Sequence, residues 1–203
     1  MAGFMRKSGA GVAAPKEAAA PVSGAAWLFR GEDITETKPN DRVRRGIVLS
    51  RERHPVFPES SVVENLRIAG YLRKGSEVRE VMDRVFTLFP ALRRLKNRKA
   101  GFLSGGEQQM LAIGMTLVVK PSLLLLDEPL LGLSPMMQKT LVEAIVNLKR
   151  DSGITVLMSE QFARPVLPII HRGYVIENGM LTLSGTGAEL MDTPEIKAAY
   201  FGI

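Results

Sequence analysis

The feature that most constrains the fold is a run of four leucines, Leu123 to Leu126, which ends in the two acids Asp127 and Glu128. A run this apolar predicts a strand buried on both faces, which is typical of parallel sheets covered by helices. An amphipathic stretch at residues 135–150 follows it, and a second apolar strand candidate comes at residues 154–158. Buried strands that alternate with amphipathic helices predict an α/β fold with a layered, mainly parallel sheet.

Helical patterns dominate the region between about residues 60 and 115, which is expected to form a helical lobe inserted in the sheet domain. Apolar residues recur there at spacings of three and four, the period of amphipathic helices. Toward the C-terminus, Asn178 and Gly179 form a turn signal beside short apolar segments and predict a hairpin. The sheet domain, with its lobe, is expected to span residues 27–203.

Residues 1–26 differ from the rest, because they are rich in alanine, glycine and proline and have no sustained apolar period. Lys16 and Glu17 interrupt the one stretch that could serve as the apolar core of a secretion signal, so no such signal is expected. The segment is expected to be flexible or a degenerate start of the domain. The chain contains no cysteine, which excludes disulfides and thiol chemistry.

The net charge of +6 does not indicate a nucleic-acid partner. The densest basic stretch, residues 93–99, contains no aromatic side chain that could stack on a base. It is therefore interpreted as a solvated helix face, and no nucleic acid is expected to bind. Apolar runs are far shorter than the roughly 18 residues needed to cross a bilayer, so any membrane role requires a partner.

Asp127 and Glu128 lie where a buried parallel strand delivers its last side chains, at the carboxyl edge where such folds bind ligands. Asp127 is a candidate Mg²⁺ ligand, since Mg²⁺ prefers one or two carboxylates together with phosphate oxygens. Glu128 is a candidate for orienting or deprotonating a water that attacks a γ-phosphate. The pattern alone is equally compatible with two acids that only end a strand and cap the next segment of the chain.

Residues 103–109, Leu-Ser-Gly-Gly-Glu-Gln-Gln, form a second chemical signal at the start of a helical stretch. Gly105 and Gly106 let backbone N–H groups approach an anion closely, and Ser104 adds a hydroxyl group. The positive end of the following helix points to the same place. A serine cap with a glycine turn accounts for Ser104 but not for the whole heptapeptide, which therefore predicts a phosphate site.

With these residues the chain resembles the ATP-binding cassette (ABC) transporter family, whose signature motif is this heptapeptide and whose Walker B strand is similar to residues 123–128. The resemblance implies a P-loop NTPase-like cassette with ATP and Mg²⁺ as cofactors, Asp127 as the metal ligand and Glu128 as a catalytic residue. It also implies nucleotide contacts from the signature residues Ser104, Gly105, Gly106, Glu107 and Gln108.

Two further positions follow from the resemblance. Glu52 falls at the Q-loop position, which implies a place beside the nucleotide and the membrane partner. Gln161 falls at the switch position, where many relatives have histidine, which implies a catalytic role. Both residues are also compatible with ordinary polar loop positions. Residues 129–135 resemble the D-loop of the family, with Leu130 in place of the usual serine.

Within the family the chain is similar to the smaller ATPase subunit of branched-chain amino-acid importers. The segments that carry this closer match are GEDIT (31–35), VFPESSVVENL (56–66), KAG (99–101) and RGYVIENG (172–179). Importers of urea and other amides share these features, so the transported solute stays open.

The chain departs from the family at the Walker A loop, G-x-x-x-x-G-K-[ST], whose amides, lysine and hydroxyl hold the phosphates and Mg²⁺. No such motif occurs in the sequence. The nearest segment, residues 8–14, has Val12 where relatives have lysine and Ala13 where they have threonine, and is either a decayed loop or a chance resemblance. We therefore expect the N-terminal strand and P-loop region to be missing or degenerate. The sheet is expected to lack a central strand and the helix behind the loop, and to expose several apolar side chains.

These observations predict an ATP-binding subunit of an ABC importer, for branched-chain amino acids, whose own Walker A site is defective. On its own the chain is expected to have weak ATPase activity or none. Expected partners are a second ABC ATPase subunit, in a heterodimer or homodimer, and transmembrane permease subunits. These partners would place the chain in the cytoplasm, on the inner face of the membrane. The alternatives are a non-hydrolysing partner that lends only its signature motif, and a truncated or frameshifted inactive cassette.

Overall fold

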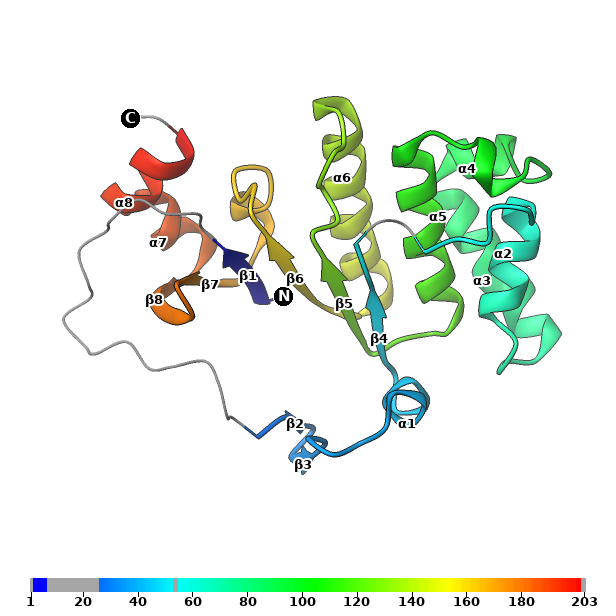
Figure 1. The fold of residues 1–203 in the computed structure, drawn as a ribbon, viewed down its shortest axis with the longest axis horizontal. Coiled ribbons are helices and arrows are strands. Elements are labelled where there is room, and N and C mark those ends of the chain that lie inside the picture. The colour runs from blue at the N-terminus through cyan, green and yellow to red at the C-terminus, as the bar shows by residue number, and fades with distance from the viewer. Residues whose placement is uncertain (1, 7–25, 53–54, 202–203) are drawn as a thin grey trace.

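The computed structural model describes residues 2–6, 26–52 and 55–201. A six-stranded sheet lies at its centre, in the order β4-β5-β6-β1-β7-β8 (Figure 1). The strands are β1 (Ala2–Arg6), β4 (Ile47–Ser50), β5 (Leu123–Asp127), β6 (Thr155–Glu160), β7 (Arg172–Glu177) and β8 (Met180–Gly185). Neighbouring strands from β4 to β7 are parallel, and β8 pairs with β7 in the antiparallel sense. The predicted mainly parallel sheet is thus confirmed.

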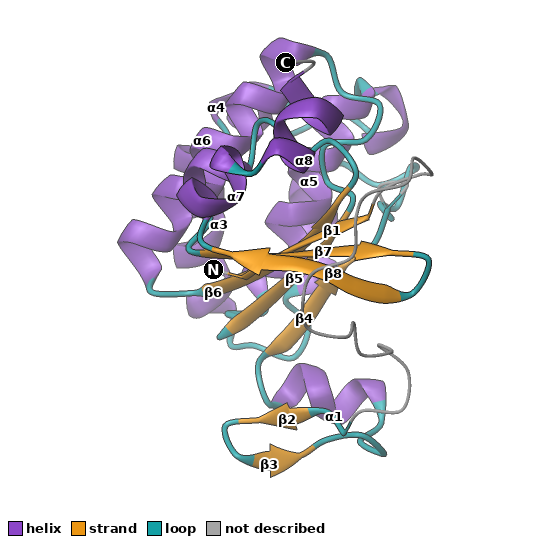
Figure 2. Cartoon of the chain, turned by 90° about the vertical axis from the view of Figure 1, so that its left-hand side faces the viewer, coloured by secondary structure: helices purple, strands orange, loops and turns teal. Residues whose placement is uncertain are grey.

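Most helices lie on one side of this sheet, as Figure 2 shows. They are α2 (Val62–Ala69), α3 (Gly75–Leu88), α4 (Pro90–Arg94), α5 (Gly105–Val118), α6 (Pro135–Ser152), α7 (Gly187–Asp192) and α8 (Pro194–Ile196). The 3-10 turn η1 (Ala100–Phe102) connects α4 to α5, the 3-10 turn η2 (Leu167–Ile169) lies between β6 and β7, and η3 (Lys197–Phe201) is a π-helical turn. On the other side lie a small hairpin, β2 (Leu28–Phe29) with β3 (Glu32–Asp33), and the short helix α1 (Pro39–Arg44) (Figure 2).

Burial along the strands distinguishes the two faces of the sheet. Leu124 and Leu126 are almost completely buried on the face that the helices cover. Each fully buried leucine contributes about 1.5–3 kcal/mol of transfer free energy. On the opposite face Leu49 is 51% exposed and Leu125 is only partly buried. The face of the sheet that the helices cover is therefore its better buried face.

Strand β1 corrects the expectation that the sheet lacks a central strand. Residues 2–6 pair in parallel with β6 on one side and with β7 on the other. The sequence did not predict this strand because Ala2 and Gly3 have low β-propensity and the segment is too short to show a period. Strand β1 therefore belongs to the sheet, although it precedes residue 26. Residues 8–14, and any helix behind the loop, lie outside the described residues.

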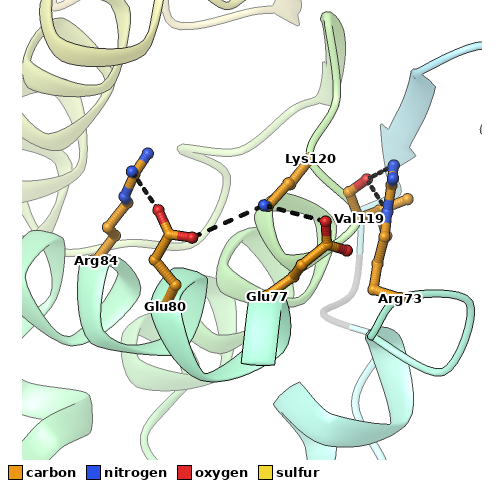
Figure 3. Close-up of polar contacts among 6 residues, drawn as sticks. All are labelled: Arg73, Glu77, Glu80, Arg84, Val119 and Lys120. Atoms are coloured by element: carbon orange, nitrogen blue, oxygen red, sulfur yellow. Dashed lines mark hydrogen bonds and ion pairs between the residues drawn. The ribbon is translucent and has the colours of Figure 1, made fainter. Parts of the chain in front are cut away.

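The helical lobe is formed by α2, α3 and α4 packed on α5, and polar contacts at the C-terminal end of α5 fasten it (Figure 3). Arg73 donates two hydrogen bonds to the carbonyl of Val119, at 3.1 Å from Nε and 2.5 Å from Nη2. Lys120 Nζ lies 3.9 Å from a carboxylate oxygen of each of Glu77 and Glu80 on α3. These contacts join the start of α3 to the connection that leads from α5 into β5.

The predicted hairpin turn is also confirmed. Asn178 and Gly179 have φ angles of 51° and 79°, the left-handed region that a tight two-residue hairpin turn requires. The turn joins β7 to β8.

Among the described residues, no helix combines the length and the apolar character needed to cross a membrane.

Candidate nucleotide site

The parallel register of β5 and β6 brings two polar side chains together at the carboxyl edge of the sheet. Asp127, the last residue of β5, is aligned with Ser159 of β6. The Ser159 hydroxyl donates a hydrogen bond of 2.6 Å to Asp127 Oδ1. Asp127 is therefore at the edge position predicted for it, with its carboxylate oriented by the neighbouring strand.

Glu128 and Gln161 follow the same two strands and are in direct contact. Gln161 Nε2 donates a hydrogen bond of 2.9 Å to Glu128 Oε1, and the Glu128 N–H donates to the Ser159 carbonyl at 3.0 Å. Glu128 has a φ of 44°, which is unusual for a residue with a side chain and costs about 1–2 kcal/mol. A carboxylate and an amide held this way can together orient a water molecule.

The alternative that these two acids cap the next helix is not supported. Helix α6 has Ser134 as its N-cap, with the Met137 N–H donating to Ser134 Oγ at 3.4 Å. Asp127 and Glu128 instead make the contacts with β6 described above.

The carboxyl edge fits a magnesium ion only if other oxygens contribute. Asp127 is exposed, and the Ser159 hydroxyl lies beside its carboxylate, so both are hard oxygen donors of the kind that Mg²⁺ prefers. Within the described part of the chain, no group of three or more His, Cys, Asp or Glu residues could hold a metal. Phosphate or water oxygens would therefore complete the ligand set, as is usual for Mg²⁺ at nucleotide sites.

Glu52 lies at the same edge of the sheet but on the neighbouring strand. Strand β4 ends at Ser50, which is aligned with Leu126 of β5, and Glu52 comes two residues later in an exposed turn. The parallel register thus places Glu52 one strand away from Asp127.

The signature motif forms the N-terminal end of α5. This helix precedes β5 by a short connection and runs back along it, so its start lies toward the carboxyl ends of the strands (Figure 1). Ser104 is the N-cap: Ser104 Oγ accepts from the Glu107 N–H at 3.4 Å, and Glu107 Oε2 accepts from the Ser104 N–H at 2.8 Å. Ser104 and Gly105 remain exposed.

Two residues for which nucleotide contacts are predicted, Glu107 and Gln108, have local structural roles. The Glu107 carboxylate completes the capping box with Ser104. Gln108 Nε2 donates a hydrogen bond of 3.1 Å to the carbonyl of Ala100, just before the motif. These contacts fix the shape of the motif, and they leave its exposed groups, those of Ser104 and Gly105, to face a ligand.

Gly106 is buried because the first turn of α6 lies against it. A Cβ atom on Gly106 would come within 2.4 Å of Met137 Cε and 3.2 Å of Met137 Cγ. The second glycine of the motif therefore permits a close approach between α5 and α6, in addition to any role with phosphate.

Sequence reasoning did not identify two residues of this region, Ser159 and Glu160. Ser159 could have been found by aligning the two apolar strands in parallel, which places it beside Asp127. Glu160 is 1% exposed, and burial raises its pKa from 4.5 to about 7, although the backbone N–H of Leu130 favours the ionised form. No pattern in the sequence indicates that this acid is buried.

Comparisons with known proteins agree with the fold and the motifs. A family model described as "ABC transporter" matches residues 16–131. The chain is 41% identical over 174 residues to the high-affinity branched-chain amino acid transport ATP-binding protein BraG of Pseudomonas aeruginosa, covering 86% of this chain and 74% of that protein. It is 38% identical over 181 residues to the probable branched-chain amino acid transport ATP-binding protein LivF of Archaeoglobus fulgidus, covering 89% and 76%.

Among solved structures, the chain is similar to the ADP conformation of MJ1267, an ATP-binding cassette of an ABC transporter. The TM-score is 0.72 at 26% identity, and the match covers 87% of this chain and 76% of that one. The family model, the identities and this structural likeness lead to one conclusion: the chain belongs to the ABC transporter family.

Proposed function

We propose that this chain is an ATP-binding subunit of an importer for branched-chain amino acids, and that its own Walker A site is defective. The names of BraG and LivF support the importer and its solute. The sequence supports the defect, because it contains no G-x-x-x-x-G-K-[ST] motif and has Val12 and Ala13 at the nearest equivalent positions. A Walker A loop without the lysine and the hydroxyl loses most of its interactions with the γ-phosphate.

The observation that carries the proposal is the exposed start of α5. Ser104 and Gly105 lie at the N-terminal end of a 14-residue helix, whose first N–H groups have no intrahelical partner apart from the cap. Such a helix end binds anions through its N–H groups and its dipole. This chemistry requires nothing from the chain's own Walker A loop, so the signature motif is assigned to an ATP held by a second cassette.

The remaining parts of the proposal follow from this assignment. A second ABC ATPase subunit supplies the intact Walker motifs and the Mg²⁺ for the competent site. Asp127, Glu128 and Gln161 belong to the other site, which lacks its phosphate cage. Transmembrane permease subunits hold the pair at the inner face of the membrane, and the transported amino acid contacts them rather than this chain.

The test is the ATPase activity of this chain reconstituted with a cassette subunit that has an intact Walker A loop. Ser104→Arg should lower turnover by about 10²-fold or more, because the arginine fills the γ-phosphate position. Glu128→Gln should lower it far less. Ser61→Arg is the matched control, since Ser61 and Glu64 form the same capping box at the start of α2.

Two results would contradict the proposal. If Glu128→Gln abolishes turnover while Ser104→Arg has no effect, the signature motif does not act on the competent site. If the mixed pair hydrolyses ATP no faster than the partner subunit alone, the chain is an inactive cassette.

A further inference from the structure

The loop after Glu128 is held by a buried acid that the proposed function does not use. This loop is the D-loop, residues 129–135. Glu160, at the end of β6, is 1% exposed, and its Oε1 accepts a hydrogen bond of 2.8 Å from the backbone N–H of Leu130. Oε2 is also buried and accepts no hydrogen bond of normal geometry from the described residues. The Leu130 side chain is 0% exposed, so both ends of this contact are fixed in the core.

Further contacts lead from Leu130 to the first turn of α6. Gln138 Nε2 donates hydrogen bonds to the carbonyls of Leu130 and Leu133, at 3.4 Å and 3.3 Å. Ser134 caps the helix by accepting from the Met137 N–H. The position of the D-loop therefore sets the position at which α6 begins.

The first turn of α6 in turn contacts the signature motif. The Met137 side chain lies so close to Gly106 that an added Cβ would overlap it. A shift of the D-loop would move Met137, and with it the surface against which Gly106 and the exposed Ser104 and Gly105 are placed. Packed protein interiors transmit such displacements because they contain little free volume.

Burying a carboxyl group at this position costs more free energy than burying an apolar side chain would. The presence of Glu160 therefore calls for an explanation other than stability. Glu160 is 1% exposed, so its carboxyl group has lost almost all contact with water. What the carboxyl provides, and an apolar side chain would not, is the acceptor for the Leu130 N–H. A role in positioning the D-loop explains why a carboxyl group is buried here, although its burial alone does not favour stability.

We propose that Glu160 is a positioning residue for the signature motif: it holds Leu130, and through the D-loop and Met137 it fixes the placement of Gly106. The consequence for ATP turnover rests on the proposed function, in which the signature motif acts on a partner's nucleotide. The placement itself is a property of this chain alone and can be measured without a partner.

The first test compares Glu160→Met with Glu160→Gln. Methionine keeps the length of the side chain but removes the acceptor, whereas the glutamine oxygen can still accept from Leu130. In the chain labelled with ¹³C-methyl methionine, the Met137 signal, assigned with Met137→Leu, should shift in Glu160→Met and stay in place in Glu160→Gln. The signal of Met82, in the helical lobe, is the internal control and should stay in place in both.

The second test measures ATP turnover of the reconstituted pair. Glu160→Met should lower kcat by about 10- to 100-fold, since small misplacements of a positioning group have effects of this size, and should leave KM for ATP unchanged. Turnover is compared well below the melting temperature of each variant, because Glu160→Met leaves the buried Leu130 N–H without an acceptor and can lower stability. Glu160→Gln should retain the wild-type kcat. A structural role alone would lower the melting temperature of Glu160→Met but leave kcat unchanged at a temperature at which the variant is folded.

The outcomes separate the two proposals. If Ser104→Arg abolishes turnover but Glu160→Met matches the wild type in both kcat and the Met137 signal, the inference about Glu160 is overturned and the proposed function stands. If Ser104→Arg has no effect, the proposed function fails, and the Met137 signal alone decides the placement. A Met137 signal unmoved by Glu160→Met overturns the inference in either case.

Discussion

Gln161 Nε2 donates a hydrogen bond of 2.9 Å to Glu128 Oε1, so the two residues that the family resemblance places at the switch and Walker B positions are in contact. The contact joins the residues that come directly after β5 and β6. Under the proposed function, these two side chains lie where a γ-phosphate would sit at this edge of the sheet. Here the arrangement that could orient a water is present, while the sequence lacks the lysine and hydroxyl that would hold its phosphate.

The isolated chain should therefore hydrolyse Mg-ATP at less than about one hundredth of the rate of a full-length cassette relative, because preorganised charge at the phosphate is lost. The measurement is phosphate release by the purified chain. Glu128→Gln in the isolated chain serves as the control for contaminating ATPases. Turnover within tenfold of a full-length relative would show that the phosphate is held by other means.

Glu160 should make the stability of the chain depend on pH. Burial raises its pKa from 4.5 to about 7, so the folded chain binds this proton more tightly than the unfolded chain does. Its contribution to stability is fully present below pH 4.5, and it is lost as the pH rises through 7. The full change corresponds to about 3 kcal/mol.

Urea unfolding of the wild type and of Glu160→Gln at pH 5 and pH 8 checks this prediction. The wild type should lose stability relative to the variant on going from pH 5 to pH 8. Glu189→Gln is the control, because hydrogen bonds from Thr186 lower the pKa of Glu189, so its ionisation is complete below this window. A wild-type-to-variant difference that is the same at both pH values would show that Glu160 does not titrate there.

Arg73 should contribute more to stability than a surface arginine does. Its guanidinium donates two hydrogen bonds to the Val119 carbonyl, whereas Arg84 pairs with Glu80 on the exposed side of α3 (Figure 3). Arg73→Gln should lower the free energy of unfolding by about 1.5–3 kcal/mol. Arg84→Gln should lower it by about 0.3–0.5 kcal/mol. Chemical denaturation of both variants gives the comparison, and equal losses would contradict the fastening role of Arg73.

Gly187 should not tolerate alanine. A Cβ there would lie 2.1 Å from the Leu167 carbonyl oxygen, and this contact is with backbone that cannot rotate away. Gly187→Ala should lower the free energy of unfolding by about 1–3 kcal/mol or more. Gly75→Ala is the matched control, since no atom lies within 4 Å of its added Cβ. A Gly187→Ala chain as stable as the control would mean that α7 can move away from η2.

The sequence predicted the elements whose chemistry is local. The apolar run of β5 forms the predicted strand, although only Leu124 and Leu126 are buried, and Asn178-Gly179 forms a turn because both residues accept left-handed backbone. Ser104 was recognised from its motif, and its capping role follows from the same residues.

The features that the sequence did not predict depend on contacts between distant segments. Strand β1 pairs with residues more than a hundred positions away, and nothing within its five residues indicates this. Glu160 is polar and ends a strand, so its burial depends on Leu130 and the D-loop folding over it. The sequence did not predict the local hydrogen bonds of Glu107 and Gln108, because the resemblance to the family motif implied nucleotide contacts for both residues.

The central position of β1 also sets an order for folding. Within the described sheet, β1 is the strand that joins β4-β5-β6 to β7-β8. Its partners are at the far end of the chain, so a ribosome releases β1 long before β6 and β7 exist. Pairings over such sequence distances form slowly, because a long loop must close first. Until β1 inserts, β6 and β7 each present an unpaired edge on which another chain could add a strand. A newly made chain should therefore be most prone to aggregate after β7 and β8 have been synthesised and before β1 has inserted between β6 and β7.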